Sequence, residues 1–101
     1  MKIKIFIGIV LFSLINTSFA NLESAMSDYK RGDYKEAYLE FKRLASLGNT
    51  TAQNNLGVMY DKGHGVQQDY QQAIYWHQKA AEQGSAEAQY NLGNIYHKGK
   101  G

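Results

Sequence analysis

Three histidines are the side chains of this sequence best suited to bind a metal ion or to move a proton near neutral pH. None of them lies in a ligand pattern such as HExxH, and the chain has no cysteine that could complete a zinc site. We expect His64 to lie in a solvated loop, His77 to take the place of a packing aromatic residue, and His97 to face a groove. The sequence therefore predicts no metal site and no cofactor.

Nucleophilic and acid–base chemistry also lack a supporting pattern. A catalytic serine needs a base and an orienting acid nearby, and the serines beyond residue 20 stand in no such motif. Glu36 and Glu40 lie one helical turn apart, but the neighbouring Lys35 and Lys42 indicate a solvated helix surface. The glycine-rich stretch KGHGVQQD lacks the lysine–serine pair of a phosphate-binding loop. We predict no catalytic residues and a non-enzymatic protein.

An internal repeat is the strongest signal in the sequence. AQNNLGVMYDKGHG at residues 52–65 and AQYNLGNIYHKGKG at residues 88–101 agree at nine of fourteen positions, 36 residues apart. Asp33-Tyr34 and Asp69-Tyr70 are separated by the same interval. A fixed period of this size predicts stacked supersecondary units.

Each unit contains two predicted helices. Residues such as Leu56 and Tyr60 recur at helical spacing in the first helix, and the second runs from an N-cap, Asp33 or Asp69, to a terminating Gly48 or Gly84. In the second helix either Trp76 or His77 completes the apolar stripe. Gly57 and Gly93 lie inside first helices, where glycine is unfavourable by about 1 kcal/mol relative to alanine. We expect them to let a partner helix approach closely enough for an aromatic ring to pack on the backbone.

The connection between the two helices differs between units. The first unit has Asp33 directly after Gly32, so it lacks five residues that the second unit has before Asp69. We expect a tight turn in the first unit and a longer loop in the second, with Val66 packing back onto the helices.

The first twenty residues have the pattern of a signal peptide: a basic start, an apolar run and a cleavage site after Ala20. Without Lys2 and Lys4 the mature chain has nine basic and nine acidic residues. A neutral chain has no basic stripe for nucleic acid and no polybasic membrane patch. We expect an exported protein, periplasmic or secreted, with no stable membrane insertion once the signal is cleaved.

The string Leu56-Gly57, Tyr60, Gly63-x-Gly65-Val66, Asp69-Tyr70, Ala73, Trp76 and Ala80-Ala81 resembles the Sel-one-like repeat, a relative of the tetratricopeptide repeat. The resemblance implies an all-α fold, a right-handed α-α superhelix (solenoid) of antiparallel helix pairs with about two and a half repeats. After a signal peptide at residues 1–20, the repeat domain at 21–101 would hold units at about 22–49, 50–85 and 86–101. The family shares no catalytic residues, so these positions are implied to be structural, and His77 departs from the usual aromatic.

The resemblance implies an adaptor that binds a protein or a peptide on the concave surface lined by first helices. The expected binding residues lie beside the inward-facing ones: Asn54, Val58, Asp61, Lys62, Tyr90, Asn94, His97, Lys98, Ser27, Lys30 and Arg31. A plain solvated surface is the alternative interpretation of this set.

The alternative function is an enzyme or binder acting on β-lactams or muropeptides, as the resemblance implies for cysteine-rich relatives, whereas this chain has no cysteine. The last helix has no predicted partner for Leu92, Ile95 and Tyr96. We expect it to fray, to self-associate with another chain, or to belong to a fragment of a longer repeat array.

Overall fold

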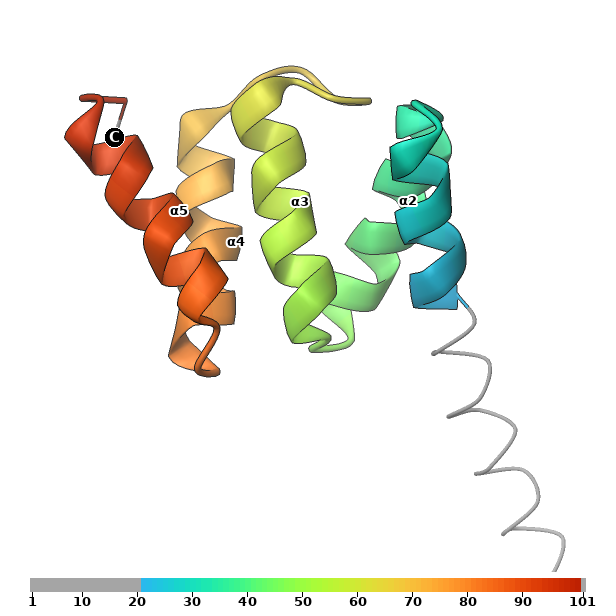
Figure 1. Ribbon diagram of the computed structural model, residues 1–101, viewed down its shortest axis with the longest axis horizontal. Helices are drawn as coiled ribbons and strands as arrows, with labels where there is room; N and C mark the ends of the chain where they lie inside the picture. Colours follow the sequence, from blue (N-terminus) through green and yellow to red (C-terminus); the bar gives the residue numbers. More distant parts are fainter. Residues whose placement is uncertain (1–20, 101) are drawn as a thin grey trace, which may run out of the picture.

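The computed structural model describes residues 21–100, and the expected signal peptide lies outside the described residues. A helical segment covers residues 21–30, followed by α2 (Tyr34–Ser46), α3 (Thr50–Lys62), α4 (Tyr70–Glu82) and α5 (Ala86–His97). Figure 1 shows these helices side by side in chain order. No strand occurs between residues 21 and 100, so the predicted all-α solenoid is confirmed. In the same range, no helix has both the length and the apolar character needed to cross a membrane.

The helices pack as successive antiparallel pairs. α2 packs on α3, α3 on α4 and α4 on α5, and α3 also touches α5 directly. The segment 21–30, α3 and α5 are thus the first helices of three successive units, and α2 and α4 are the second helices. We call the surface formed by the first helices the first-helix face.

Capping residues set where these helices begin. Asn49 accepts a hydrogen bond from the backbone N–H of Ala52, and Asp69 accepts from Gln71 and Gln72, as the sequence predicted for Asp69. Asp33 holds the N-cap position of α2 as predicted, but its side chain makes no cap hydrogen bond. Its backbone angles, φ −80° and ψ 63°, lie outside the extended region typical of capping residues, and Oδ2 accepts from Arg31 Nε at 3.2 Å.

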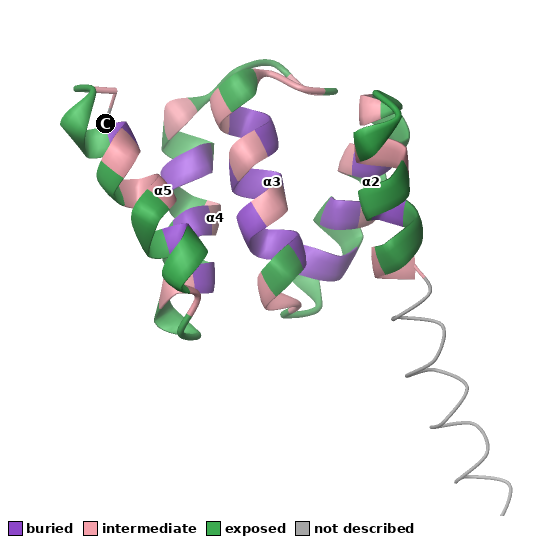
Figure 2. Cartoon of the chain, viewed as in Figure 1, coloured by how far each residue is buried: buried purple, intermediate pink, exposed green. Residues whose placement is uncertain are grey.

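The core follows the repeat, as Figure 2 shows by the buried bands on α2, α3 and α4. His77, only 1% exposed, fills the apolar stripe, whereas Trp76 is half-buried. A Cβ on Gly57 would lie 2.7–2.8 Å from the His77 ring, so only glycine fits there without displacing the ring. The predicted close approach at Gly57 is confirmed, and a histidine supplies the ring.

The long loop of the second unit folds back onto the first unit. A Cβ on Gly65, whose φ is +74°, would lie 2.4 Å from the Tyr34 carbonyl oxygen, so the loop backbone rests against the start of α2. Val66 packs against the core as predicted. The expectation that His64 is solvated is wrong: its half-buried ring stacks on Tyr34, with centroids 4.2 Å apart.

Candidate functional site

A large concave feature of the described surface lies on the first-helix face. It is a hollow of about 460 Å³, and we call it the amide hollow because three asparagines line it. The lining residues are Tyr29, Asn55, Val58, Asp61, Lys62, His77, Glu87, Asn91 and Asn94. They come from all three first helices and from α4, so the hollow exists only because successive units stack.

An apolar pocket of about 100 Å³ adjoins the hollow, and we call it the aliphatic pocket. Its lining residues are Met26, Tyr29, Lys30, Phe41, Asn55 and Val58. Tyr29, Asn55 and Val58 line both spaces, so the two are neighbours separated by these shared side chains. Together they offer an apolar site followed by a polar one along the first-helix face.

A buried hydrogen-bond network forms the floor of the amide hollow. Asn54 Oδ1 accepts from His77 Nδ1 at 2.9 Å and from Asn91 Nδ2 at 3.0 Å, which links α3, α4 and α5. Burial lowers the pKa of His77 to about 4, and the nearby Asp61 carboxylate opposes this shift. His77 is therefore neutral at pH 7 with its proton on Nδ1, a state suited to holding the floor together.

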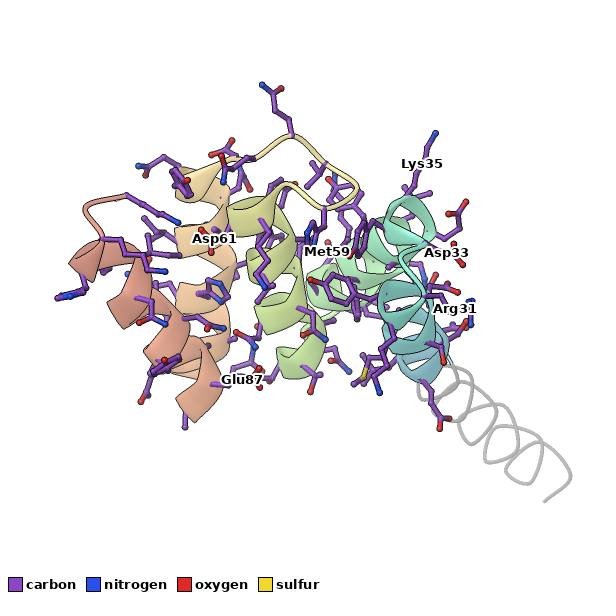
Figure 3. All side chains as sticks on the ribbon, turned by 45° about the horizontal axis from the view of Figure 1, so that its top comes forward. Arg31, Asp33, Lys35, Met59, Asp61 and Glu87 are labelled. Carbon is purple, nitrogen blue, oxygen red and sulfur yellow. The ribbon has the colours of Figure 1, made fainter. Side chains whose placement is uncertain are left out.

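Two carboxylates lie toward opposite ends of the hollow. Figure 3 shows Asp61 near the end of α3 and Glu87 near the start of α5. Asp61 Oδ1 is shielded from solvent and accepts no hydrogen bond, and Lys100 Nζ lies 3.8 Å away. Glu87 forms no ion pair with any residue in 21–100. The acidic groups of the hollow are thus only partly compensated.

The wall nearest the first unit is built around Tyr29. Its hydroxyl lies 2.9 Å from His64 Nδ1, and its ring packs at 5.1 Å from Tyr34. Burial, with a contribution from Tyr34, raises the pKa of the Tyr29 phenol, so the hydroxyl keeps its proton at neutral pH. The long loop therefore fixes the position of a residue that both the hollow and the pocket share.

The structure places the expected binding residues in three groups. Val58, Asp61, Lys62 and Asn94 line the amide hollow, and Lys30 joins Val58 in the aliphatic pocket. Asn54 is only 3% exposed, so the expectation that its side chain lies on the surface is wrong. Exposed residues that line neither space form the third group: Ser27, Arg31, Tyr90, His97 and Lys98.

The sequence analysis missed several lining residues, among them Asn55, Asn91 and Glu87. Asn55 and Asn91 are 36 residues apart, so they hold the same position in successive first helices. Asn55 also lies three and seven residues before Val58 and Lys62, on one helical face. That spacing was an available signal, but Asn54 lies four and seven residues before Val58 and Asp61, so helical spacing alone does not choose between the two asparagines.

The chemistry available at the site is recognition through hydrogen bonds and apolar contact. No group of three potential metal ligands occurs within residues 21–100. The hydrogen-bonded histidines of this range pair with Tyr29 and Asn54, and neither contacts a serine. Amides, a phenol and two carboxylates converge on the hollow, which suits binding of a polar chain.

Comparisons with known proteins agree with this architecture. The family model described as Sel1 repeat matches residues 50–85 and 86–101. A protective antigen present in uropathogenic Escherichia coli strains, with an SLR fold, is 38% identical with a TM-score of 0.76, and the match covers 81% of this chain. A Sel1 repeat protein from Oxalobacter formigenes is 42% identical with a TM-score of 0.72 over 78% of this chain. The chain spans 18% and 32% of those two proteins. No curated protein matches significantly.

Proposed function

The chain belongs to the Sel1 repeat family, and from this premise we propose that it is an exported, non-enzymatic scaffold that binds a protein or peptide partner on its first-helix face. Members of this family are helical repeat scaffolds that generally mediate protein–protein interactions. The observation that carries the proposal is the amide hollow of about 460 Å³, which spans three successive first helices. Its size falls within the range of about 300–1,000 Å³ that is typical of ligand sites.

A pull-down from an envelope extract tests the binding role. The full chain, tagged at its C-terminus, should capture a partner, and Val58→Glu should lose it, because a charge would then stand where the hollow and the pocket meet. Leu39→Glu is the matched control, since Leu39 is 61% exposed on α2 and lines neither space. Equal capture by both variants would contradict the assignment to the first-helix face.

A turnover assay tests the non-enzymatic role. The purified chain is incubated with β-lactam and muropeptide substrates, and product formation is followed by chromatography. We expect no turnover above a buffer control, since no serine, threonine or cysteine of the described residues lines the hollow and burial raises the pKa of the one hydroxyl that lies beside a histidine there, Tyr29. Turnover that disappears in Val58→Glu would overturn this part of the proposal.

Export is supported by the basic start, apolar run and cleavage pattern of residues 1–20. Mass spectrometry of the chain recovered from the periplasm or medium of an expressing bacterium should find Asn21 as its first residue. Recovery only of the uncleaved chain in the membrane fraction would contradict export in soluble form.

Self-association through α5 is the second part of the proposed interactions. Gly93 has nothing within 4 Å of its Cβ position, and Tyr96 is 56% exposed. The equivalent α3 residues, Gly57 and Tyr60, are buried against other helices of this chain. A second copy of the chain carries the same helices and could cover α5 in the same way. Sedimentation velocity should show a concentration-dependent dimer that Leu92→Asp abolishes, and a monomer at every concentration would contradict it.

A further inference from the structure

The size of the aliphatic pocket limits what enters it. A dry cavity of about 150 Å³ in a protein core holds one benzene ring. The aliphatic pocket is smaller, at about 100 Å³, and Met26, Phe41 and Val58 line it with apolar surface. Its volume and apolar lining therefore suit one aliphatic side chain, such as leucine or methionine.

The three asparagines of the amide hollow suit a peptide main chain. Asn55 and Asn94 make no side-chain hydrogen bond to any residue between 21 and 100, and Asn91 uses only its Nδ2 group, toward Asn54. Asn55 and Asn94 each offer two N–H donors and an acceptor, and Asn91 offers its acceptor and its second N–H, which match the N–H and C=O groups of an extended chain. Asn55 and Asn91 repeat on successive first helices, so their amides are spaced along the path that crosses from α3 to α5.

The charges in the hollow favour a basic ligand group. Glu87 has no ion-pair partner in the described part of the chain, and Asp61 has only Lys100 at 3.8 Å. A lysine or arginine of a ligand donates several hydrogen bonds to a carboxylate, and such charge-assisted bonds are stronger than neutral ones. Lys62, the one basic residue that lines the hollow, is exposed and free to extend into solvent.

We propose that the first-helix face binds an extended peptide segment whose aliphatic side chain enters the aliphatic pocket and whose basic side chain pairs with Glu87. This inference rests on the proposed binding function and specifies the partner's chemistry. Side chains of an extended chain share a face at every second residue, and four residues span about 13 Å. Packed helix axes lie about 8–10 Å apart, and the aliphatic pocket and Glu87 belong to different first helices. Two residues of an extended chain span only about 7 Å, so four residues is the shortest spacing on one face of the peptide that covers such a step.

A random twelve-residue peptide library displayed on phage provides the test. The full chain is used for selection in parallel with Glu87→Lys, Val58→Glu and Glu36→Lys. Glu36 lies in the first turn of α2, as Glu87 does in α5, and it is exposed and lines neither space. Glu36→Lys therefore makes the same charge change in the first turn of a helix, away from the first-helix face. Circular dichroism confirms that each variant is folded.

The wild-type chain and Glu36→Lys should enrich the same motif, an aliphatic and a basic residue four positions apart in either order. Glu87→Lys should lose the basic preference and bind the wild-type consensus peptide about tenfold more weakly, and Val58→Glu should lose the aliphatic preference. Enrichment of acidic peptides, or a basic preference that survives in Glu87→Lys, overturns the inference. If no peptide is enriched while the envelope pull-down still yields a partner, the inference falls and the binding function stands. If both experiments fail, both proposals fall.

Discussion

Helices α3 and α5 carry the same sequence pattern but have different surroundings. On the side that faces the preceding unit, both are buried: Ala52 and Ala88 are fully buried, and Met59 and Ile95 are 0% and 3% exposed. On the other side, Leu56 is fully buried and Gly57 lies against the His77 ring of α4, whereas Leu92 is only half-buried and Gly93 has nothing within 4 Å of its Cβ position. Burial of this second side is thus not a property of the repeated residues. It depends on whether a second helix lies against them, as α4 does for α3.

The largest expected difference between the two helices is at the leucines. Leu56→Ala should lower the free energy of unfolding by about 2–5 kcal/mol, since a fully buried leucine leaves a cavity. Leu92→Ala, at a half-buried site, should lower it by about 1 kcal/mol. Urea unfolding followed by circular dichroism measures both. Equal losses would show that another copy of the chain covers the open side of α5 in solution. Repeating the measurement at a concentration where sedimentation shows a monomer tests this, because the loss for Leu92→Ala should then be smaller than the loss for Leu56→Ala.

A second difference comes from the ring that covers α3. His77 has a pKa of about 4 in the folded chain and about 6.5 when unfolded, so the unfolded chain binds more protons between these values. The contribution of neutral His77 to the free energy of unfolding should be fully present above pH 6.5. This contribution should fall by up to ~3 kcal/mol as the pH drops to 4. His77→Phe should remove this part of the pH dependence. Phenylalanine fits because Phe41 is buried at the same position of the preceding unit.

Urea unfolding of wild type and His77→Phe at pH 7.5 and 4.5 isolates the histidine, because the carboxylates titrate in both proteins. The difference in free energy between the two proteins should shift in favour of the phenylalanine variant at pH 4.5. An unchanged difference would mean that His77 is already exposed in solution and that α4 does not cover Gly57 as described.

The fold was largely predictable because the repeat period and the helical spacing are local signals. The sequence also predicted that a ring packs against the backbone at Gly57. The residues that line the site were less predictable, because their exposure depends on residues distant in the sequence. Successive residues turn by 100° around a helix, so a choice between Asn54 and Asn55 depends on where α5 lies. His64 was expected in solvent because its partners, Tyr29 and Tyr34, belong to the preceding unit. Asp33 makes no cap hydrogen bond because the tight turn before α2 holds its backbone outside the extended region, which the residue type alone does not reveal.

The two glycines should respond to the same substitution with opposite sign. Gly57→Ala would bring a Cβ to 2.7–2.8 Å from a buried ring that cannot move aside, so we expect a loss of about 1–3 kcal/mol. In the monomer, Gly93→Ala meets nothing within 4 Å and removes the entropic penalty of glycine in a helix, so at concentrations where sedimentation shows a monomer we expect a gain of about 0.5–1 kcal/mol. Thermal and urea unfolding of both variants measure the signs. A loss at Gly93 would show that a helix seats there in solution.

The helix caps should show the smallest difference, and here α3 and α5 should behave alike. Asn49 Oδ1 accepts from Ala52 N–H at 2.9 Å, and Ser85 Oγ accepts from Ala88 N–H at 3.1 Å. A cap acts on its own first turn, so Asn49→Ala and Ser85→Ala should each lower stability by about 1 kcal/mol, as urea unfolding of the whole chain measures it. The prediction is that Asn49→Ala and Ser85→Ala lower the free energy of unfolding by equal amounts. A much smaller loss for Ser85→Ala would mean that α5 unfolds separately from the rest, because a helix that is already open adds nothing to the measured free energy. Amide hydrogen exchange in α5 would then be faster than in α3, and the difference between the two helices would be one of folding as well as of burial.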